Sequence, residues 1–279
     1  MADIARSVSD AATPKLRGLR CRGIAASSTS GGLLATSRLQ EQGDRHGKVS
    51  QYSTSLEDCM QSRLRRDVEL VVFDLDGTLV DSREDIAGAV NQGLQAVGGP
   101  GRPGEDIYPL IGRPLLQIFA ELLPPGLGAR AVEAQAVFRR YYLDHCFDRS
   151  RLYPGVVECI ERMKSVPLAV ATTKMTFMAI RVIEHTGLAP HFSLVQGSDD
   201  IPHKPDPTLL RIVLGKTGKQ AERSWMVGDT VYDIQAGKAA GMRTCAVTYG
   251  IGSAADLGEE GPDLMVASLV ELPSRLGFP

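Results

Sequence analysis

The stretch Leu70–Ser82, LVVFDLDGTLVDS, constrains the fold of this chain more than any other segment. Its first four residues are apolar and lack the polar alternation of a half-exposed strand, which predicts a strand buried on both faces of a parallel sheet. Residues i and i+2 of a strand project to the same side, so we expect Asp74 and Asp76 to face one pocket as a pair. Gly77 then permits a turn. Because two converging carboxylates repel each other, the stretch also predicts a cation beside the strand end.

The segment after this strand predicts a helical insertion over residues 83–150. Apolar residues at helical spacing fill 83–97, a glycine- and proline-rich run breaks that helix at 98–104, a second helix should start near Pro114, and a third covers 129–147. Such an insertion can serve as a lid.

From residue 154 the pattern alternates between short apolar strands and amphipathic helices, which is typical of a doubly wound α/β sheet. The predicted strands cover 167–172, 192–196, 224–228, 243–248 and 263–267. The predicted helices cover 155–165, 176–186, 206–215 and 233–240. We therefore expect an α/β core of mostly parallel strands, made of residues 67–82 and 151–279, with the helical cap 83–150 inserted.

Composition limits the classes of protein to which the chain can belong. At 279 residues and 43% hydrophobic content it can bury a full core. Residues 1–66 carry eleven Lys/Arg against six Asp/Glu without interleaved aromatics, so they predict a disordered or targeting extension and no nucleic-acid footprint. No apolar run approaches the ~20 residues of a membrane span. We expect a cytoplasmic protein, or an organellar one if the extension is a transit peptide.

Polar residues follow several predicted strands at the edge where a parallel sheet binds its ligands. The first strand ends in Asp74 and Asp76, the second in Thr172-Thr173-Lys174, and the fourth in Gly228-Asp229, with Asp233 shortly after. His203-Lys204-Pro205 precedes a predicted helix. Oxygen ligands beside a lysine predict a hard cation, with Mg²⁺ the first choice, and a phosphate-handling site.

Four segments, in this order and spacing, resemble the four motifs of the haloacid dehalogenase (HAD) superfamily. They are FDLDGTLVDS, VATTK, HKPDP and GDTVYDIQAG, and the resemblance covers residues 68 to about 250. The predicted insertion resembles the small α-helical cap of the phosphoglycolate phosphatase-like branch, and LIGRPL at 110–115 resembles the cap loop of that branch.

This resemblance implies a role for each matching residue. Asp74 would be the nucleophile that forms an aspartyl-phosphate, and Asp76 the acid and base. Thr172 would bind the transferring phosphoryl group, and Lys204 would neutralise its charge. Mg²⁺ would be held by Asp74, by Asp76 through its backbone carbonyl, by Asp229 and by Asp233.

The resemblance also implies substrate-binding residues, and two of these assignments have alternatives. Gly77 and Thr173 belong to this set, with Thr173 also the alternative to Thr172 for the phosphoryl contact. Arg113 would contact a distal anionic group of the substrate, or it is a solvated arginine at a helix start.

Chemical need separates the reactions of the superfamily. Dehalogenation has no use for an acid such as Asp76, and a phosphonatase needs a cap lysine, whereas residues 84–150 contain none. The resemblance therefore predicts Mg²⁺-dependent hydrolysis of a small phosphate monoester, with phosphoglycolate a leading candidate. The alternatives are a β-phosphoglucomutase-like transfer, which Gly228 disfavours because such enzymes carry glutamate there, and a non-catalytic phosphate- or partner-binding protein. The expected partner is a small phosphorylated metabolite, without nucleic acid or membrane.

Overall fold

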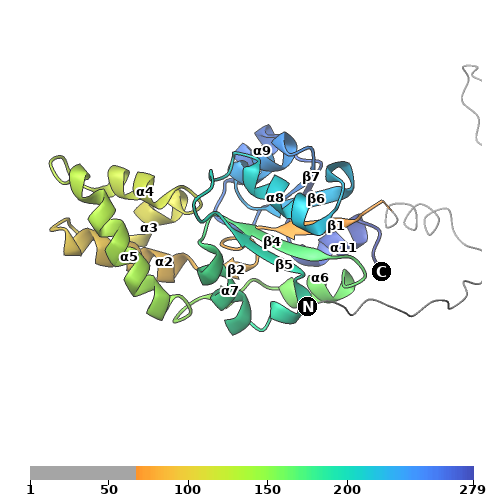
Figure 1. The fold of residues 1–279 in the computed structure, drawn as a ribbon, viewed down its shortest axis with the longest axis horizontal. Coiled ribbons are helices and arrows are strands. Elements are labelled where there is room, and N and C mark those ends of the chain that lie inside the picture. The colour runs from red at the N-terminus through yellow and green to blue at the C-terminus, as the bar shows by residue number, and fades with distance from the viewer. Residues whose placement is uncertain (1–66) are drawn as a thin grey trace, which may run out of the picture. The chain divides into compact units, whose positions relative to one another are not determined.

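A six-stranded parallel sheet is the centre of residues 67–279, the part of the chain that the computed structural model describes (Figure 1). The strand order is β5-β4-β1-β6-β7-β8. The strands are β1 (Leu70–Phe73), β4 (Leu168–Thr172), β5 (Leu194–Gly197), β6 (Ser224–Gly228), β7 (Arg243–Val247) and β8 (Leu264–Val266). Phe73 lies opposite Val170 of β4 and Val227 of β6. This register brings the chain segments that follow β1, β4 and β6 to the same edge of the sheet.

Side-chain alternation along β1 explains why helices cover both faces of the sheet. Val71 and Phe73 belong to one buried cluster, together with apolar residues of α6 (Val156–Arg162), α7 (Thr176–His185) and α11 (Leu272–Arg275). Leu70 and Val72 belong to a second cluster, with α8 (Thr208–Thr217) and α9 (Val231–Ala239). Figure 1 shows α8 and α9 above the sheet and α6 and α7 below it. Each fully buried side chain of this kind contributes about 1.5–3 kcal/mol to folding.

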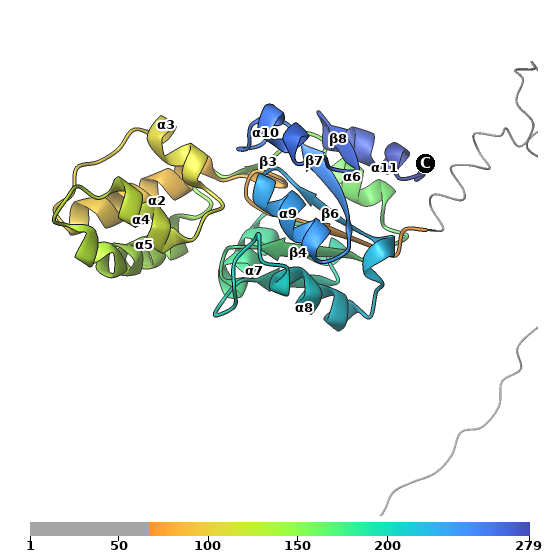
Figure 2. The ribbon, with the colours of Figure 1, turned by 90° about the horizontal axis from the view of Figure 1, so that it is seen from above.

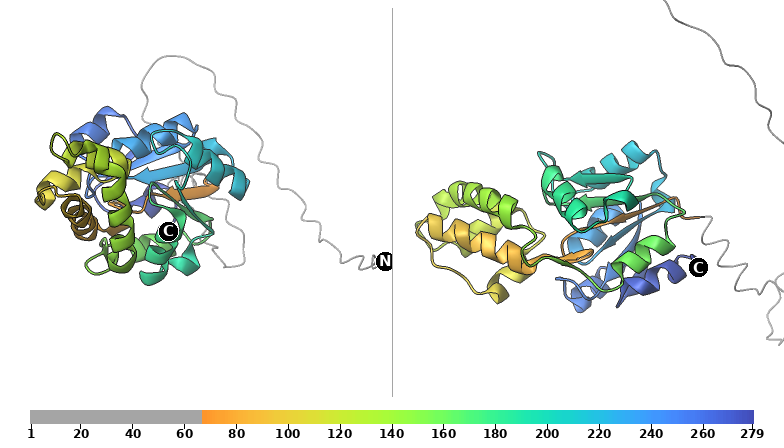
Figure 3. Two further views of the ribbon diagram at one scale, coloured as in Figure 1. Left: turned by 60° about the vertical axis from the view of Figure 1, so that its left-hand side comes forward. Right: turned by 90° about the horizontal axis from the view of Figure 1, so that it is seen from below.

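Four helices form a cap beside the sheet, and two short strands carry the chain into the cap and back (Figures 2 and 3). The cap helices are α2 (Arg83–Ala96), α3 (Gly104–Ile107), α4 (Leu115–Leu122) and α5 (Ala131–His145). In the linkers, β2 (Val80–Asp81) pairs antiparallel with β3 (Arg151–Leu152). Short elements complete the chain: η1 (Tyr108–Leu110), η2 (Gly128–Arg130), η3 (Ala189–His191), η4 (Ala221–Arg223), α10 (Ala254–Glu259) and η5 (Leu269–Glu271).

Close packing of α2 against α5 forms the interior of the cap, whose buried side chains belong to the same cluster as Val71 and Phe73 of the sheet. A Cβ at Gly93 of α2 would lie 2.6 Å from the backbone oxygen of Ala134 on α5, so the two helices approach too closely there for a larger residue. Phe138 of α5 stacks on Tyr142 and meets the edge of Phe119 from α4, with ring centroids 5.3 and 6.4 Å apart. The cap can therefore hold its shape as a unit.

The structure confirms the predicted fold class, a mostly parallel α/β sheet with a helical insertion after its first strand. Predicted and observed strands agree to within two residues at their ends. The β2–β3 pair, α3, α10 and α11 were not predicted, because two to six residues are too few to show a hydrophobic period. The division into core and cap domains stays a prediction, and the predicted extension over 1–66 lies outside the described residues. No helix within 67–279 has the length and apolar character to cross a membrane.

Asp85 connects the two linkers at the base of the cap. It lies in the first turn of α2 and is 6% exposed. Its carboxylate accepts hydrogen bonds from the backbone N–H of Arg149, at 3.0 Å, and from the N–H and Oγ of Ser150, at 2.8 and 2.7 Å. These bonds hold the segment that leaves the cap against the segment that enters it.

We expect Asp85→Ala to lower the free energy of unfolding by about 2 kcal/mol, because the substitution leaves the buried N–H and hydroxyl of Ser150 and the backbone N–H of Arg149 without an acceptor. Urea unfolding followed by circular dichroism measures the change. The neighbouring Glu84→Ala is the matched control, since Glu84 makes only an exposed ion pair with Arg149 and should change stability by less than about 0.5 kcal/mol. Equal stabilities of the two variants would contradict the role assigned to Asp85.

Candidate active site

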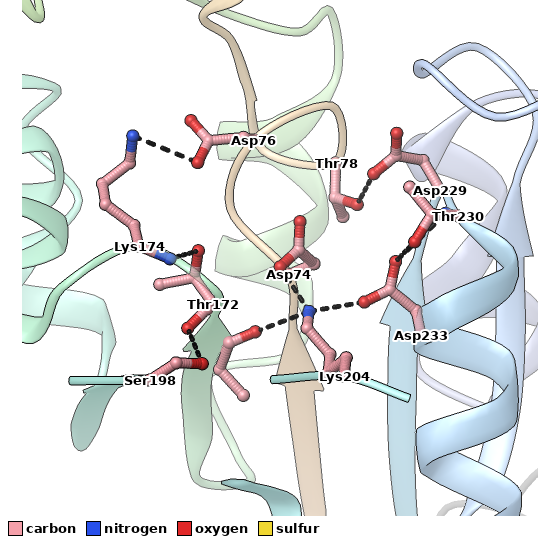
Figure 4. A network of polar contacts seen from close by, with 11 residues as sticks. Asp74, Asp76, Thr78, Thr172, Lys174, Ser198, Lys204, Asp229, Thr230 and Asp233 are labelled. Carbon is pink, nitrogen blue, oxygen red and sulfur yellow. Dashed lines mark hydrogen bonds and ion pairs between the residues drawn. The ribbon is translucent and has the colours of Figure 1, made fainter. Parts of the chain in front are cut away.

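Three buried carboxylates meet at the edge of the sheet where β1 and β6 end (Figure 4). Asp74 directly follows β1, Asp229 directly follows β6, and Asp233 lies in the first turn of α9. One oxygen from each lies within 4.8 Å of the others. The sequence brings them together because parallel strands with aligned register end at one edge.

Lys204 joins two of these carboxylates. Its Nζ donates to Oδ1 of Asp74 and Oδ1 of Asp233, both at 2.5 Å, and to the backbone oxygen of Ala171 at 3.1 Å. All three ammonium hydrogens therefore have acceptors. The side chain is buried, which disfavours its charged form, but the two carboxylates outweigh burial and raise the pKa of Lys204. Lys204 stays a cation inside the protein.

Both oxygens of Asp229 accept hydrogen bonds from the core. Thr78 donates through its hydroxyl at 2.7 Å, and Ile251 donates through its backbone N–H at 2.8 Å. Burial, followed by the charge of Asp233, raises the pKa of Asp229 to about 7. These bonds fix the direction of the carboxylate without removing its preference for a nearby positive charge.

Glycines let the chain approach Asp229 closely. Gly77 has a φ of +92°, and a Cβ at this position would overlap the Asp229 carboxylate. A Cβ at Gly250 would overlap both Asp229 and the backbone oxygen of Gly77. A glycine is therefore needed at position 77 for two reasons: the positive φ disfavours other residues, and a side chain would overlap Asp229.

Asp233 serves a helix and a lysine at the same time. Its Oδ2 accepts from the backbone N–H and the hydroxyl of Thr230, at 3.0 and 2.7 Å, in the capping box of α9, while its Oδ1 accepts from Lys204. Its side chain has an exposed fraction of 1%. The capping box at the N-terminus of α9 therefore fixes the position of the Asp233 carboxylate.

The charges of the cluster are not balanced by the protein alone. Burial and the charges of Asp233 and Asp229 together outweigh Lys204 and raise the pKa of Asp74 well above its ordinary value. Three carboxylates face one lysine, so a bound cation would relieve the remaining repulsion. The donors offered are oxygens, which suit a hard divalent ion. The residues present thus fit a metal site.

Asp76 lies apart from this cluster, which differs from the expected pair with Asp74. Its carboxylate accepts a hydrogen bond from the Ser82 hydroxyl at 2.5 Å and forms an ion pair with Lys174 at 3.1 Å. β1 ends at Phe73, so strand alternation no longer governs the direction of the later side chain. Each carboxylate has a lysine of its own. The backbone carbonyl of Asp76 stays a predicted metal ligand.

Lys174 closely follows a predicted strand, but the sequence alone does not indicate its role. It lies two residues beyond β4, and its Nζ also donates to the hydroxyl of Tyr142 on α5, at 2.8 Å. The signal for Lys174 was its place directly after the predicted strand, whereas nothing in the sequence pointed to Tyr142.

Thr172 is buried at the end of β4, and its hydroxyl accepts from the backbone N–H of Lys174 at 3.2 Å.

A cavity of about 130 Å³ lies between the cap and the edge of the sheet. Asp76, Thr173 and Lys174 line its sheet side. The remaining lining residues come from the cap, from α7 and from the neighbouring loops: Ile86, Ile111, Gly112, Arg113, Leu115, Ile118, Gln135, Phe138, Arg139, Tyr142, Met178, Asp199 and His203. Arg113 also lines this cavity, where its guanidinium forms an ion pair with Glu121 at 2.9 Å, and its contact with a substrate stays a prediction.

Comparisons with known proteins agree with this geometry. The model of the haloacid dehalogenase-like hydrolase family matches residues 71–247. A phosphoglycolate phosphatase of Pseudomonas aeruginosa is 35% identical over 73% of this chain and 78% of its own length. The pyrophosphatase PpaX of Listeria monocytogenes is 34% identical over 74% of this chain and 94% of its own. A haloacid dehalogenase-like hydrolase structure from Streptococcus pneumoniae has a TM-score of 0.70 at 28% identity, and the match covers 75% of this chain and 99% of that one.

The chain belongs to the haloacid dehalogenase-like hydrolase family. This confirms the resemblance seen in its four motifs, and with it an enzyme of the phosphatase class.

The raised pKa of Asp229 predicts how stability depends on pH when no divalent cation is present. The folded protein holds this proton up to about pH 7, whereas the unfolded chain releases it near its ordinary value of about 4. Between these values the folded state binds more protons, so the free energy of unfolding should fall as pH rises, by an amount on the order of a few kcal/mol. Asp74 shifts in the same direction.

Denaturant unfolding at pH 5 and pH 8, in the presence of a chelator, measures this fall. Asp229→Asn is the control, because the amide cannot titrate and the variant should lose less stability between the two pH values. Identical losses in the wild type and the variant would show that Asp229 does not carry the effect.

Proposed function

We propose that this enzyme is a Mg²⁺-dependent phosphatase that hydrolyses a small phosphate monoester through an aspartyl-phosphate on Asp74. The observation that carries the proposal is the separation of two carboxylates, each with its own lysine. Asp74 lies in the buried acidic cluster with Lys204, and Asp76 lies on the wall of the adjacent cavity with Lys174. A nucleophile and an acid therefore occupy different environments side by side.

The acidic cluster would hold the metal. Asp74, Asp229 and the backbone carbonyl of Asp76 are the proposed ligands, and Asp233 acts directly or through water. When bound, Mg²⁺ supplies positive charge against the phosphate and the clustered carboxylates. The hydrogen bonds from Thr78 and Ile251 keep Asp229 directed at this position before any ligand arrives.

The protein's own residues then account for both halves of the reaction. A carboxylate oxygen of Asp74 attacks phosphorus, while Lys204 holds the other carboxylate oxygen and offsets the charge. Asp76 gives a proton to the leaving oxygen and later takes one from the water that attacks the acyl phosphate. We assign the phosphoryl oxygens to Thr172, with Thr173 and the turn at Gly77 completing the site. This list suffices because phosphoryl transfer depends mainly on alignment and charge.

The cavity favours a small substrate, with phosphoglycolate a leading candidate. Its volume of about 130 Å³ leaves room for only a short leaving group. A hydrolase is favoured over a mutase by Gly228, because a Cβ there would overlap the side chain of Asp233 and the glutamate of a mutase would not fit. Ile86, Ile118 and Phe138 on the cap side also offer no hydrogen-bond partners to sugar hydroxyls.

We expect the purified protein to release phosphate from phosphoglycolate in the presence of Mg²⁺, and to lose this activity when a chelator is added. A colorimetric phosphate assay over phosphoglycolate, p-nitrophenyl phosphate and nucleotides measures it. Recovery on adding back Mg²⁺ controls for damage by the chelator. A folded protein that releases phosphate from none of these esters, with Mg²⁺ present, would refute the proposed function.

We expect Asp74→Asn to lower turnover by roughly three orders of magnitude or more, because the amide cannot act as the nucleophile. The shape of the side chain is kept, so circular dichroism should match the wild type. The matched control is Asp67→Asn, the same substitution at an exposed position before β1, which should leave turnover unchanged. Near-wild-type activity of Asp74→Asn would place the nucleophile elsewhere.

A further inference from the structure

The cavity must receive the leaving group of the substrate, if the proposed function holds. Asp76 lines the cavity, whereas Asp74 does not. An acid that protonates the leaving oxygen lies on the side of that oxygen, so the rest of the leaving group extends from Asp76 into the cavity. The polar groups around this space therefore select the substrate.

Lys174 and Tyr142, which line the cavity, each have one hydrogen-bond donor without an acceptor among residues 67–279. Lys174 has three N–H bonds, and two of them are directed at Asp76 and Tyr142. Tyr142 accepts the bond from Lys174, so its own O–H proton is free to donate. Burial raises the pKa of Tyr142 well above its ordinary value despite the nearby lysine, so the hydroxyl keeps its proton. Lys204, by contrast, has no donor left.

The wall of the cavity adds an arginine that has no acidic partner. Arg139 lies one helical turn before Tyr142 on α5 and lines the same cavity. Within residues 67–279 no carboxylate lies within ion-pair distance of its guanidinium. Its charge reaches the interior, because burial and then Arg139 lower the pKa of His203 on the same cavity. Nδ1 of His203 is buried without a hydrogen-bond partner.

We propose that Lys174, Tyr142 and Arg139 form a subsite for a second anionic group, carried by the leaving group of the phosphate ester. A carboxylate one carbon away from the ester oxygen would accept from Lys174 and Tyr142 and face Arg139. The apolar residues Ile86, Ile118 and Phe138 also line this cavity, and its volume of about 130 Å³ limits the carbon chain between the two anions to a short one. The substrate class is a short phosphate monoester of a hydroxy acid.

This subsite differs from the one that the cap loop suggests. Arg113 also lines the cavity, but Glu121 already neutralises its guanidinium. That pair is exposed and therefore weak, whereas Arg139 has, within the described part of the chain, no pair to break before it meets an anion. The helix α5 therefore supplies a positive charge to the cavity that does not depend on the loop 110–115.

Two esters that share the phosphate and the first carbon of the leaving group test the subsite, namely 2-phosphoglycolate and ethyl phosphate, which has a methyl group in place of the carboxylate. The readout is the ratio of their kcat/KM values. We expect the wild type to favour phosphoglycolate, and Arg139→Gln to lower the ratio roughly tenfold, mainly through the KM for phosphoglycolate. Arg140→Gln removes a neighbouring charge that does not line the cavity, so its ratio should match the wild type. Tyr142→Phe should lower the ratio as Arg139→Gln does.

Binding separates this proposal from the proposed function. Asp74→Asn is expected to bind both esters without turnover, so calorimetry with this variant gives the Kd of ethyl phosphate divided by the Kd of phosphoglycolate. Adding Arg139→Gln should lower this ratio, because phosphoglycolate then binds more weakly. Equal ratios with and without Arg139 overturn the subsite, even if both esters are hydrolysed. A wild type that hydrolyses neither ester but binds phosphoglycolate through Arg139 overturns the proposed function and supports the subsite.

Discussion

The buried ammonium of Lys204 is the interaction on which the rest of the site depends. Three carboxylates within 4.8 Å of one another, all hidden from water, would repel strongly without a positive charge among them. Lys204 supplies that charge from a loop distant in sequence, and its third hydrogen bond attaches it to the backbone of β4. The lysine thereby connects β1, β4 and α9 at one edge. The sheet aligns the ends of β1, β4 and β6, and the hydrogen bonds of Lys204 then hold the side chains of Asp74 and Asp233 in place.

A second lysine divides the chemistry of the first motif. Asp74 and Asp76 are only two residues apart, yet Lys204 holds one in the acidic cluster and Lys174 holds the other at the cavity. Two carboxylates in one environment would titrate as a coupled pair, whereas these two face different lysines. Because the chain turns at Gly77 directly after them, the separation is built into the backbone. The same turn leaves room for the Asp229 carboxylate, so Gly77 both separates Asp76 from Asp74 and lets Asp229 approach the acidic cluster.

The sequence was sufficient for most of the core and for only part of the site. Strand ends such as Asp74 and Asp229 were predictable because parallel strands deliver their carboxyl ends to one edge, and Lys204 through its motif. The direction of the Asp76 side chain could not be predicted, because strand alternation stops at Phe73. The contact of Lys174 with Tyr142 joins residues 32 positions apart in sequence, and no periodicity reports it. The two-residue pair β2–β3 was missed for a related reason, because its register depends on the cap that it connects.

The path of the chain assigns chemistry and selectivity to different parts of the molecule. The cluster around Lys204 is built from the sheet edge and α9, where Thr78 donates to Asp229 and Thr230 donates to Asp233. Tyr142 and Arg139 lie on α5, inside the segment that leaves the sheet at β2 and returns at β3. Substitutions on the cavity-facing side of α5 can therefore change which leaving group fits without disturbing Asp74, Asp229 or Asp233. Tyr142 is the exception, since its bond to Lys174 reaches the acid itself, and through it the cap contributes to the chemistry as well as to recognition.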